Sequence, residues 1–320
     1  MSERHPPRKS KVQDMSYVIG VTQEESVPKA PLREIPPIAR QFHVWRLIGA
    51  AVTLLIAGSI ILSLSQNEAL NWPVIQEFMF QERVVAGLRL TLELTVISMI
   101  GALILATIIA NMRLSPNVVL RSISWAFVWF FRGIPLLVLL VLMFNVSLLY
   151  PEVSVGLPGQ TPIWSASSGD LLNPFWAAVV AFVLHQSAYT SEVIRTSIRA
   201  VPKGQIEAAE SLGMTHLRTL QRIVLPQALR IAIPPIANDA INLLKATSLV
   251  AFIAVSDLLY SVQQIYASNY QIVPLLVVAA LWYLIIVSIM SVGQWALERR
   301  FGRGTARLGT TVKAAGGKNR

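Results

Sequence analysis

The sequence predicts an all-α, polytopic integral membrane protein with about six membrane-spanning helices. Of the 320 residues, 54% are hydrophobic and only 14% are charged, whereas soluble domains carry about 25% charged residues. The mean hydropathy of +0.56 arises from long uncharged blocks rather than from evenly spread core residues. Cysteine is absent, which excludes disulfide scaffolds, thiol catalysis and the usual zinc sites. The composition therefore argues against an ordinary soluble enzyme.

The N-terminal region combines a polar segment with an apolar one. Residues 1–45 are rich in proline, lysine and arginine, a composition that predicts a flexible tail because it cannot bury a core. This basic leader is far longer than that of a secretory signal peptide. No charged residue occurs from Leu47 to Asn67, and a spanning helix needs about 20 apolar residues. We therefore expect residues 46–66 to form an additional, retained N-terminal transmembrane helix.

Five further blocks are long enough to span a membrane. The third of the six spans, 122–150, is expected to kink where Gly133 and Pro135 follow Arg132. The fifth span, 230–252, is a weaker candidate for a membrane helix because the charged residues Asp239 and Lys245 interrupt it. We expect a broken helix there, beside Pro234-Pro235. The residues between the fifth and sixth blocks are interpreted as an external loop. The six predicted spans are 46–66, 86–111, 122–150, 174–197, 230–252 and 272–297.

The distribution of basic residues predicts the orientation. Most lysine and arginine residues lie in the two tails and in the segment between spans four and five, and six spans place all of these on one side. The opposite segments 151–173 and 253–271 contain no lysine or arginine. Cytoplasmic loops carry the excess of basic residues, so both termini are predicted to be cytoplasmic. The net charge of +10 is thus a topology signal and does not indicate nucleic acid.

The cytoplasmic loop at 200–228 carries the most informative pattern. Gly204 provides a break before a short helix expected to begin near Gln205, and Gly213 is expected to end it. A second helix is expected over 215–224, ending at Pro226. The first helix offers small residues that let a partner approach its backbone, together with apolar and acidic side chains. These are Ile206, Glu207, Ala208, Ala209, Glu210, Leu212 and Gly213.

The spacing in this loop resembles a family signature. It runs Glu207-Ala208-Ala209, three residues, Gly213, nine residues, Ile223, one residue, Leu225-Pro226. The spacing is that of ABC importer permeases. The resemblance extends over residues 80–302, which are similar to polar amino-acid permeases of the histidine/glutamine/arginine/opine type. Further matching segments are Gly87–Thr95, Phe131–Leu137, Ala188-Tyr189, Leu225–Pro235 and Leu244–Leu249.

The resemblance implies a machine of several chains. It implies the type I ABC importer permease fold, with a coupling helix that docks into a groove of the ATPase subunit. The docking residues are then Gly204, Ile206, Glu207, Ala208, Ala209, Leu212 and Gly213. Implied partners are two ATPase subunits, an identical or homologous second permease, an extracytoplasmic solute-binding protein and a polar amino acid. ATP and magnesium would be bound by the ATPase, so this chain needs no cofactor of its own. Membrane lipid is expected around the spans, residues 80–302 form the permease domain, and 303–320 form a basic cytoplasmic tail.

Ionisable residues inside predicted spans need a reason, because each costs a few kcal/mol or more in hydrocarbon. Arg132 is either a pathway residue or a structural residue neutralised by Asp239 or Glu93. Glu192 either pairs with Arg195, one helical turn away, or provides a counter-charge for a substrate amino group.

The remaining substrate-path candidates lie in spans four and five. Asp239 is the best candidate for contact with a zwitterion, with Asn238 beside it, since broken membrane helices line ligand paths in some transporters. His185 has no neighbouring cysteine or histidine, which makes it a poor metal ligand and favours a hydrogen-bonding or cavity-lining role.

No phosphate-binding loop of the Gly-x-x-x-x-Gly-Lys-Ser/Thr type occurs, so we expect that this chain does not hydrolyse ATP and has no enzymatic activity of its own. Three alternatives stay open. They are the same machinery with an opine or another small organic cation as cargo, an ion-driven secondary transporter, and a membrane scaffold or sensor.

Overall fold

The structure is a computed structural model that describes residues 44–155 and 163–301. The predicted tails therefore lie outside the described residues, apart from positions 44 and 45. The chain divides into two units, Met1–Ser59 and Ile60–Arg320. Helix α1 (Val44–Ser65) crosses this division and confirms the predicted N-terminal apolar helix. Almost every other described element is also helical, as predicted.

Helices occupy all six segments predicted to span the membrane. The bounds of the five after α1 are α3 Glu82–Leu114, α4 Val118–Gly133 continued by α5 Leu136–Phe144, α8 Pro174–Arg199, α11 Leu225–Ala246 and α13 Ile272–Phe301. The shorter elements are η1 Glu68–Leu70, α2 Trp72–Met79, α6 Val146–Leu149, α7 Ser168–Leu171, α9 Lys203–Ser211, α10 His216–Thr219, η2 Leu220–Val224, η3 Thr247–Ile253 and α12 Leu258–Asn269.

The expected number of spans is reached only in part. In the described residues, four helices are long and apolar enough to cross a membrane, and the bent pair α4–α5 would make a fifth. Helix α8 is 26 residues long but more polar, because it buries Gln186, Thr190 and Ser191. A sixth span at α8 therefore stays a prediction.

Two large hydrophobic clusters form the core of the second unit. Helices α3 and α8 share the most extensive contact, and Leu94 and Phe182 lie fully buried in the first cluster. The second cluster joins α3, α12 and α13 around Val84 and Leu258. At this junction the backbones approach closely, since a Cβ at Gly87 would lie only 2.7 Å from the carbonyl oxygen of Asp257.

The predicted kink in the third span is confirmed, but the span is not one continuous helix over 122–150. It begins at Val118, and α4 and α5 meet at 100°. Ile134 is extended, with φ −92° and ψ 131°, because a residue that precedes proline is disfavoured in the helical region. The proline therefore separates two helices instead of bending one.

The expected break at Pro234-Pro235 is wrong. Helix α11 continues through both prolines and is held between α8 and α13, as neighbouring helices can do for a proline-containing membrane helix. The irregular backbone begins later, at the 3-10 helix η3. The external loop expected between spans five and six is not irregular throughout, because it contains α12, whose N-terminus is capped by the Asp257 carboxylate at 2.9 Å from the Tyr260 amide.

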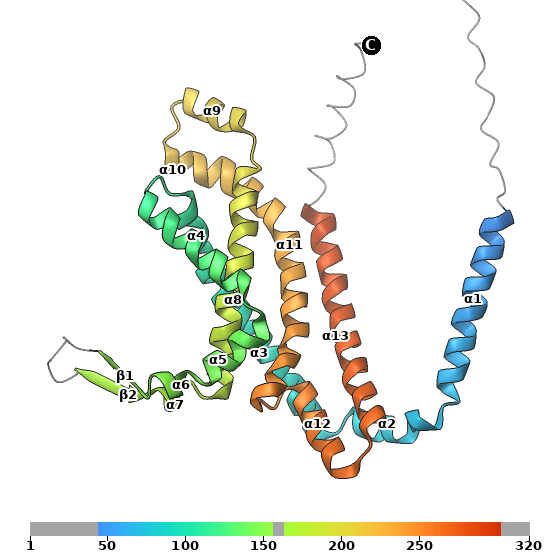
Figure 1. Cartoon of the computed structure of the whole chain (residues 1–320). Helices are drawn as coiled ribbons and strands as arrows, with labels where there is room; N and C mark the ends of the chain where they lie inside the picture. The colour runs from blue at the N-terminus through green and yellow to red at the C-terminus, as the bar shows by residue number, and fades with distance from the viewer. Residues whose placement is uncertain (1–43, 156–162, 302–320) are drawn as a thin grey trace, which may run out of the picture. The chain divides into compact units, whose positions relative to one another are not determined.

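The second unit has two distinct ends (Figure 1). Helices α9 and α10 lie at one end, together with the beginning of α4, and α12 lies at the other. The end that carries α12 also holds an antiparallel hairpin of β1 (Glu152–Val155) and β2 (Trp164–Ser167), with Glu152 opposite Ser167. Residues 156–162 of the segment 151–173 lie outside the described residues.

Candidate functional site

Helix α9 is a short helix with a well-defined end. It begins at Lys203, two residues before the expected start, and ends at Ser211. Gly213 follows with φ +74°, its amide donates to the Glu210 carbonyl at 2.9 Å, and the Met214 amide donates to the Ala209 carbonyl at 3.1 Å. These two bonds form a Schellman motif, which needs a left-handed residue at the glycine position. The prediction that Gly213 ends this helix is confirmed.

The α9 surface divides into an outer and an inner face. Glu207, Ala208 and Leu212 are exposed, and Leu212 keeps 83% of its surface accessible. Gly204 and Gly213 are exposed as well, and a Cβ at either would meet no atom within 4 Å. In contrast, Ala209 is buried and Ile206 is half-buried. The outer face is therefore open to a partner, while Ile206 and Ala209 hold α9 against its own loop.

The α9 loop is connected rigidly to two long helices. Val201, Val224 and Ala228 form a small cluster with Ile206, which joins the end of α8, α9 and the start of α11. The Gln227 amide donates to the Gln205 side-chain oxygen at 2.5 Å. The expected helix end at Pro226 is wrong, because α10, η2 and α11 follow one another without a break and Pro226 lies in the first turn of α11, where a missing N–H costs nothing. A force on α9 would thus reach both α8 and α11.

Two of the predicted path residues meet on one aromatic ring of α8. The Arg132 guanidinium lies over the Tyr189 ring, 4.8 Å from its centroid, and the His185 ring lies 5.0 Å from the same ring. In the described residues Arg132 makes no ion pair, and Glu93 pairs instead with Arg89 at 2.7 Å. The alternative that Arg132 is neutralised by Asp239 or Glu93 is therefore not supported.

Asp239 takes part in a polar chain between α8 and α11. The Gln186 amide donates to the Thr190 hydroxyl at 3.0 Å, and that hydroxyl donates to the Asp239 carboxylate at 3.1 Å. Asp239 is half-buried and, among the described residues, has no cationic partner, whereas Asn238 is exposed. One carboxylate oxygen of Asp239 thus has capacity for a further donor.

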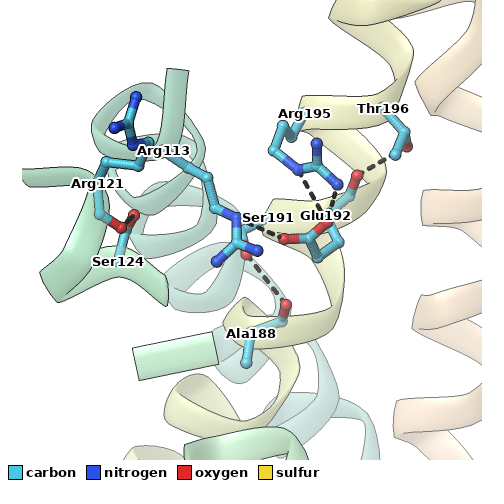
Figure 2. A network of polar contacts seen from close by, with 8 residues as sticks. All are labelled: Arg113, Arg121, Ser124, Ala188, Ser191, Glu192, Arg195 and Thr196. Carbon is cyan, nitrogen blue, oxygen red and sulfur yellow. Dashed lines mark hydrogen bonds and ion pairs between the residues drawn. The ribbon is translucent and has the colours of Figure 1, made fainter. Parts of the chain in front are cut away.

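Glu192 belongs to a separate cluster nearer the α9 end of α8. Its carboxylate accepts from Arg195 at 2.5 and 2.9 Å and lies 3.0 Å from the Arg113 guanidinium of α3. Figure 2 shows Arg113 and Arg195 on two sides of this carboxylate. The predicted pairing with Arg195 is confirmed, and the ion pair with Arg113 is a contact that sequence reasoning missed. Since Glu192 is already paired, it has less capacity to bind a substrate amino group than Asp239.

The structure also identifies residues that were not among the sequence candidates. They include two residues of α8: Tyr189, which lies four residues after His185, and Thr190, which lies four residues after Gln186. Residues four apart share a helix face, which is the signal that would have grouped them. Arg113 had no such signal, because its partner lies on another helix.

Comparison with known proteins gives a consistent result. Residues 102–303 match the family model described as the binding-protein-dependent transport system inner membrane component. The chain is 39% identical over 274 residues to the arginine transport system permease protein ArgU of Corynebacterium glutamicum, covering 85% of each protein. It is 40% identical over 246 residues to the L-cystine transport system permease protein TcyB of Bacillus subtilis, covering 77% of this chain and 97% of the relative.

The fold is similar to that of a solved transporter. A crystal structure of an amino acid ABC transporter with histidines contains a chain that superposes with a TM-score of 0.61 at 28% identity. The match covers 70% of this chain and 97% of the solved chain.

Proposed function

Because the chain belongs to the family of binding-protein-dependent transport system inner membrane components, we propose that it carries polar amino acids across the cell membrane. The chain is a multi-pass, non-enzymatic membrane subunit, the permease of an ABC importer. We propose that ATP and magnesium are bound and ATP is hydrolysed by two separate ATPase subunits. A second permease copy, identical or homologous, and an extracytoplasmic solute-binding protein complete the assembly.

The observation that carries the proposal is the exposed outer face of α9. Glu207, Ala208, Leu212 and the two glycines form a small, partly apolar surface on a helix that is firmly joined to the rest of the chain. Such a surface allows close backbone approach by a partner. We propose that the ATPase docks here, that both termini lie on the same cytoplasmic side, and that Ile206 and Ala209 shape the surface from inside.

The coupling mechanism follows from the connections of α9. Movement of the ATPase displaces α9, and the cluster around Val201 and Val224 transfers that displacement to α8 and α11 together. These two helices carry Thr190 and Asp239, whose hydrogen bond links them. Thr190 lies nine residues before the end of α8, which is about 14 Å along a helix. The motion thus reaches the candidate path without an intervening flexible segment.

The path residues fit a zwitterionic cargo. Asp239 offers a carboxylate with free acceptor capacity, and Arg132 offers a guanidinium without an ion pair among the described residues. An amino acid presents one ammonium and one carboxylate group, so the two residues supply one complementary charge each. Coupling requires that cargo and ATP favour different conformational states. An opine or another small organic cation would use the same carboxylate, so the experiment has to determine which cargo is carried.

Transport by the reconstituted assembly tests the proposal. The full chain, its ATPase and its binding protein are placed in proteoliposomes, and uptake of labelled arginine, cystine, histidine and glutamine is measured with and without ATP. We expect ATP-dependent uptake of at least one of them. Ala208→Trp should abolish ATPase co-purification, because the bulk lies on the outer face of α9, whereas Leu217→Trp adds an exposed indole outside that face and should retain it. Uptake that persists without the ATPase would instead indicate an ion-driven transporter.

A further inference from the structure

A basic pocket lies where the ends of α3 and α8 meet the beginning of α4. The cavity measures about 360 Å³, and it lies beside the Glu192 cluster shown in Figure 2. Its lining residues are Arg113, Arg121, Ser122, Trp125, Arg195 and Arg199. This pocket is distinct from the residues around Tyr189 and Asp239 and from the outer face of α9.

The charge of the pocket is poorly balanced. Four guanidinium groups line it, while Glu192 is the carboxylate that pairs with two of them, Arg113 and Arg195. In the part of the chain that the structure describes, Arg121 and Arg199 form no ion pair. The pocket therefore retains an excess of positive charge, which favours an anionic occupant.

One of these guanidinium groups has a buried donor without an acceptor. The Arg113 side chain is 21% exposed, and its Nε atom lies 3.0 Å from Glu192 Oε1 in an ion pair. Among the described residues, neither the buried Nη1 of Arg113 nor the buried Oε1 of Glu192 has a hydrogen-bond partner. A buried donor on a charged group costs free energy when it has no partner. An anion in the adjoining pocket would offset part of this cost by its charge, while Nη1 itself stays shielded from the pocket.

A second cavity of about 380 Å³ continues from the first along α4. It shares Arg113 and Trp125 with the basic pocket and is also lined by Val128, Trp129, Arg132 and Gly133, so its far end reaches the Arg132 of the candidate path. Trp125 and Trp129 are stacked at 6.2 Å and are both more than half exposed. Exposed tryptophan is typical of the membrane–water interface. A charged pocket thus opens into an aromatic, largely apolar groove.

We propose that this double cavity binds an anionic phospholipid of the cytoplasmic leaflet. The phosphate is held by Arg121 and Arg199, since guanidinium groups bind phosphate with two parallel hydrogen bonds, and Arg113 adds positive charge to the wall of the pocket. The first part of an acyl chain lies against Trp125 and Trp129. Basic pockets between transmembrane helices on the cytoplasmic side have this function in other membrane proteins. The leaflet follows from the proposed orientation, whereas the lipid site itself does not depend on which cargo is carried.

Lipid binding to the purified full-length permease, in complex with its ATPase, tests the proposal. Native mass spectrometry measures binding of phosphatidylglycerol and of phosphatidylcholine to the wild type and to the double variant Arg121→Gln, Arg199→Gln. The double variant keeps the Glu192 ion pairs. The control, Arg299→Gln with Arg300→Gln, removes two exposed arginines at the same end of the second unit, on α13.

We expect the wild type and the control to prefer phosphatidylglycerol, and the double variant to bind it about 30-fold more weakly, because each arginine near an anionic lipid contributes about fivefold. Ser122→Asp places a negative charge in the same pocket and should weaken phosphatidylglycerol binding as well. This single variant keeps the proposal testable if the double variant does not fold. Equal phosphatidylglycerol binding by all variants would overturn the proposal. Loss of phosphatidylglycerol binding by the wild type in millimolar inorganic phosphate would assign the pocket to a soluble anion and overturn the lipid assignment.

Discussion

Substitution of Gly213 tests whether α9 depends on backbone conformation or on close approach by a partner. Gly213 has φ +74°, and a Cβ added there would meet no atom of the chain within 4 Å. The cost of Gly213→Ala in the free chain is therefore a backbone cost, about 1–2 kcal/mol for a left-handed residue. Asparagine tolerates this conformation better than alanine. Gly213→Asn should thus be milder than Gly213→Ala, although its side chain is larger.

The expected magnitude follows from the length of the helix. Helix α9 has nine residues, fewer than the about 12–15 that an isolated helix needs, so its terminal motif contributes much of its local stability. A loss of about 1–2 kcal/mol changes the ratio of capped to frayed α9 by a factor of about 5–30. If the capped form alone binds the ATPase, the apparent Kd rises by up to the same factor.

Two measurements distinguish a requirement for the left-handed backbone at Gly213 from a requirement for close approach by the ATPase. Hydrogen exchange of the Met214 amide, which donates to Ala209, reports fraying directly, and titration with the ATPase subunit reports docking. The backbone argument predicts that binding weakens in the order glycine, asparagine, alanine. The order glycine, alanine, asparagine would show that steric exclusion at the docked surface dominates. Unchanged exchange in Gly213→Ala would refute the conformational argument altogether.

Three further substitutions test the path, the ion-pair cluster and the helix packing. Asp239→Asn should weaken cargo uptake at least tenfold while it spares basal ATP hydrolysis, and unaltered uptake in proteoliposomes would remove this residue from the path. Glu192→Gln should lower the free energy of unfolding by about 2 kcal/mol because it leaves two partly buried arginines without a counter-charge. Glu93→Gln removes one partner of an exposed ion pair and should cost less than about 1 kcal/mol. The thermal inactivation of the two variants is compared. Gly87→Ala should cost about 1–3 kcal/mol through overpacking against α12, in contrast to Gly293→Ala, where space is open; equal thermal stability of both variants would contradict the packing.

The helices and the α9 loop could be predicted because their signals are local. Uncharged blocks indicate apolar helices wherever they occur, and Gly213 carries the conformational requirement of its own position. The bend before Pro135 is local as well, since the ring restricts the residue that precedes it. The apparent break at Pro234-Pro235 was misjudged because a proline's effect within a helix also depends on the helices packed around it. Likewise, α12 was missed because the segment has no charges and resembles an external loop in composition.

The sequence by itself determined the helical membrane architecture, the family signature and the position of α9, because hydropathy, glycine conformation and motif spacing are properties of short stretches of chain. The tertiary structure decided which side chains meet: Arg132 with Tyr189, Thr190 with Asp239, and Arg113 with Glu192. These pairs connect different helices, and the rotation of each helix about its axis is set by packing against its neighbours. No periodicity within one segment determines that rotation, so the pairs and the basic pocket became evident when the helices were assembled.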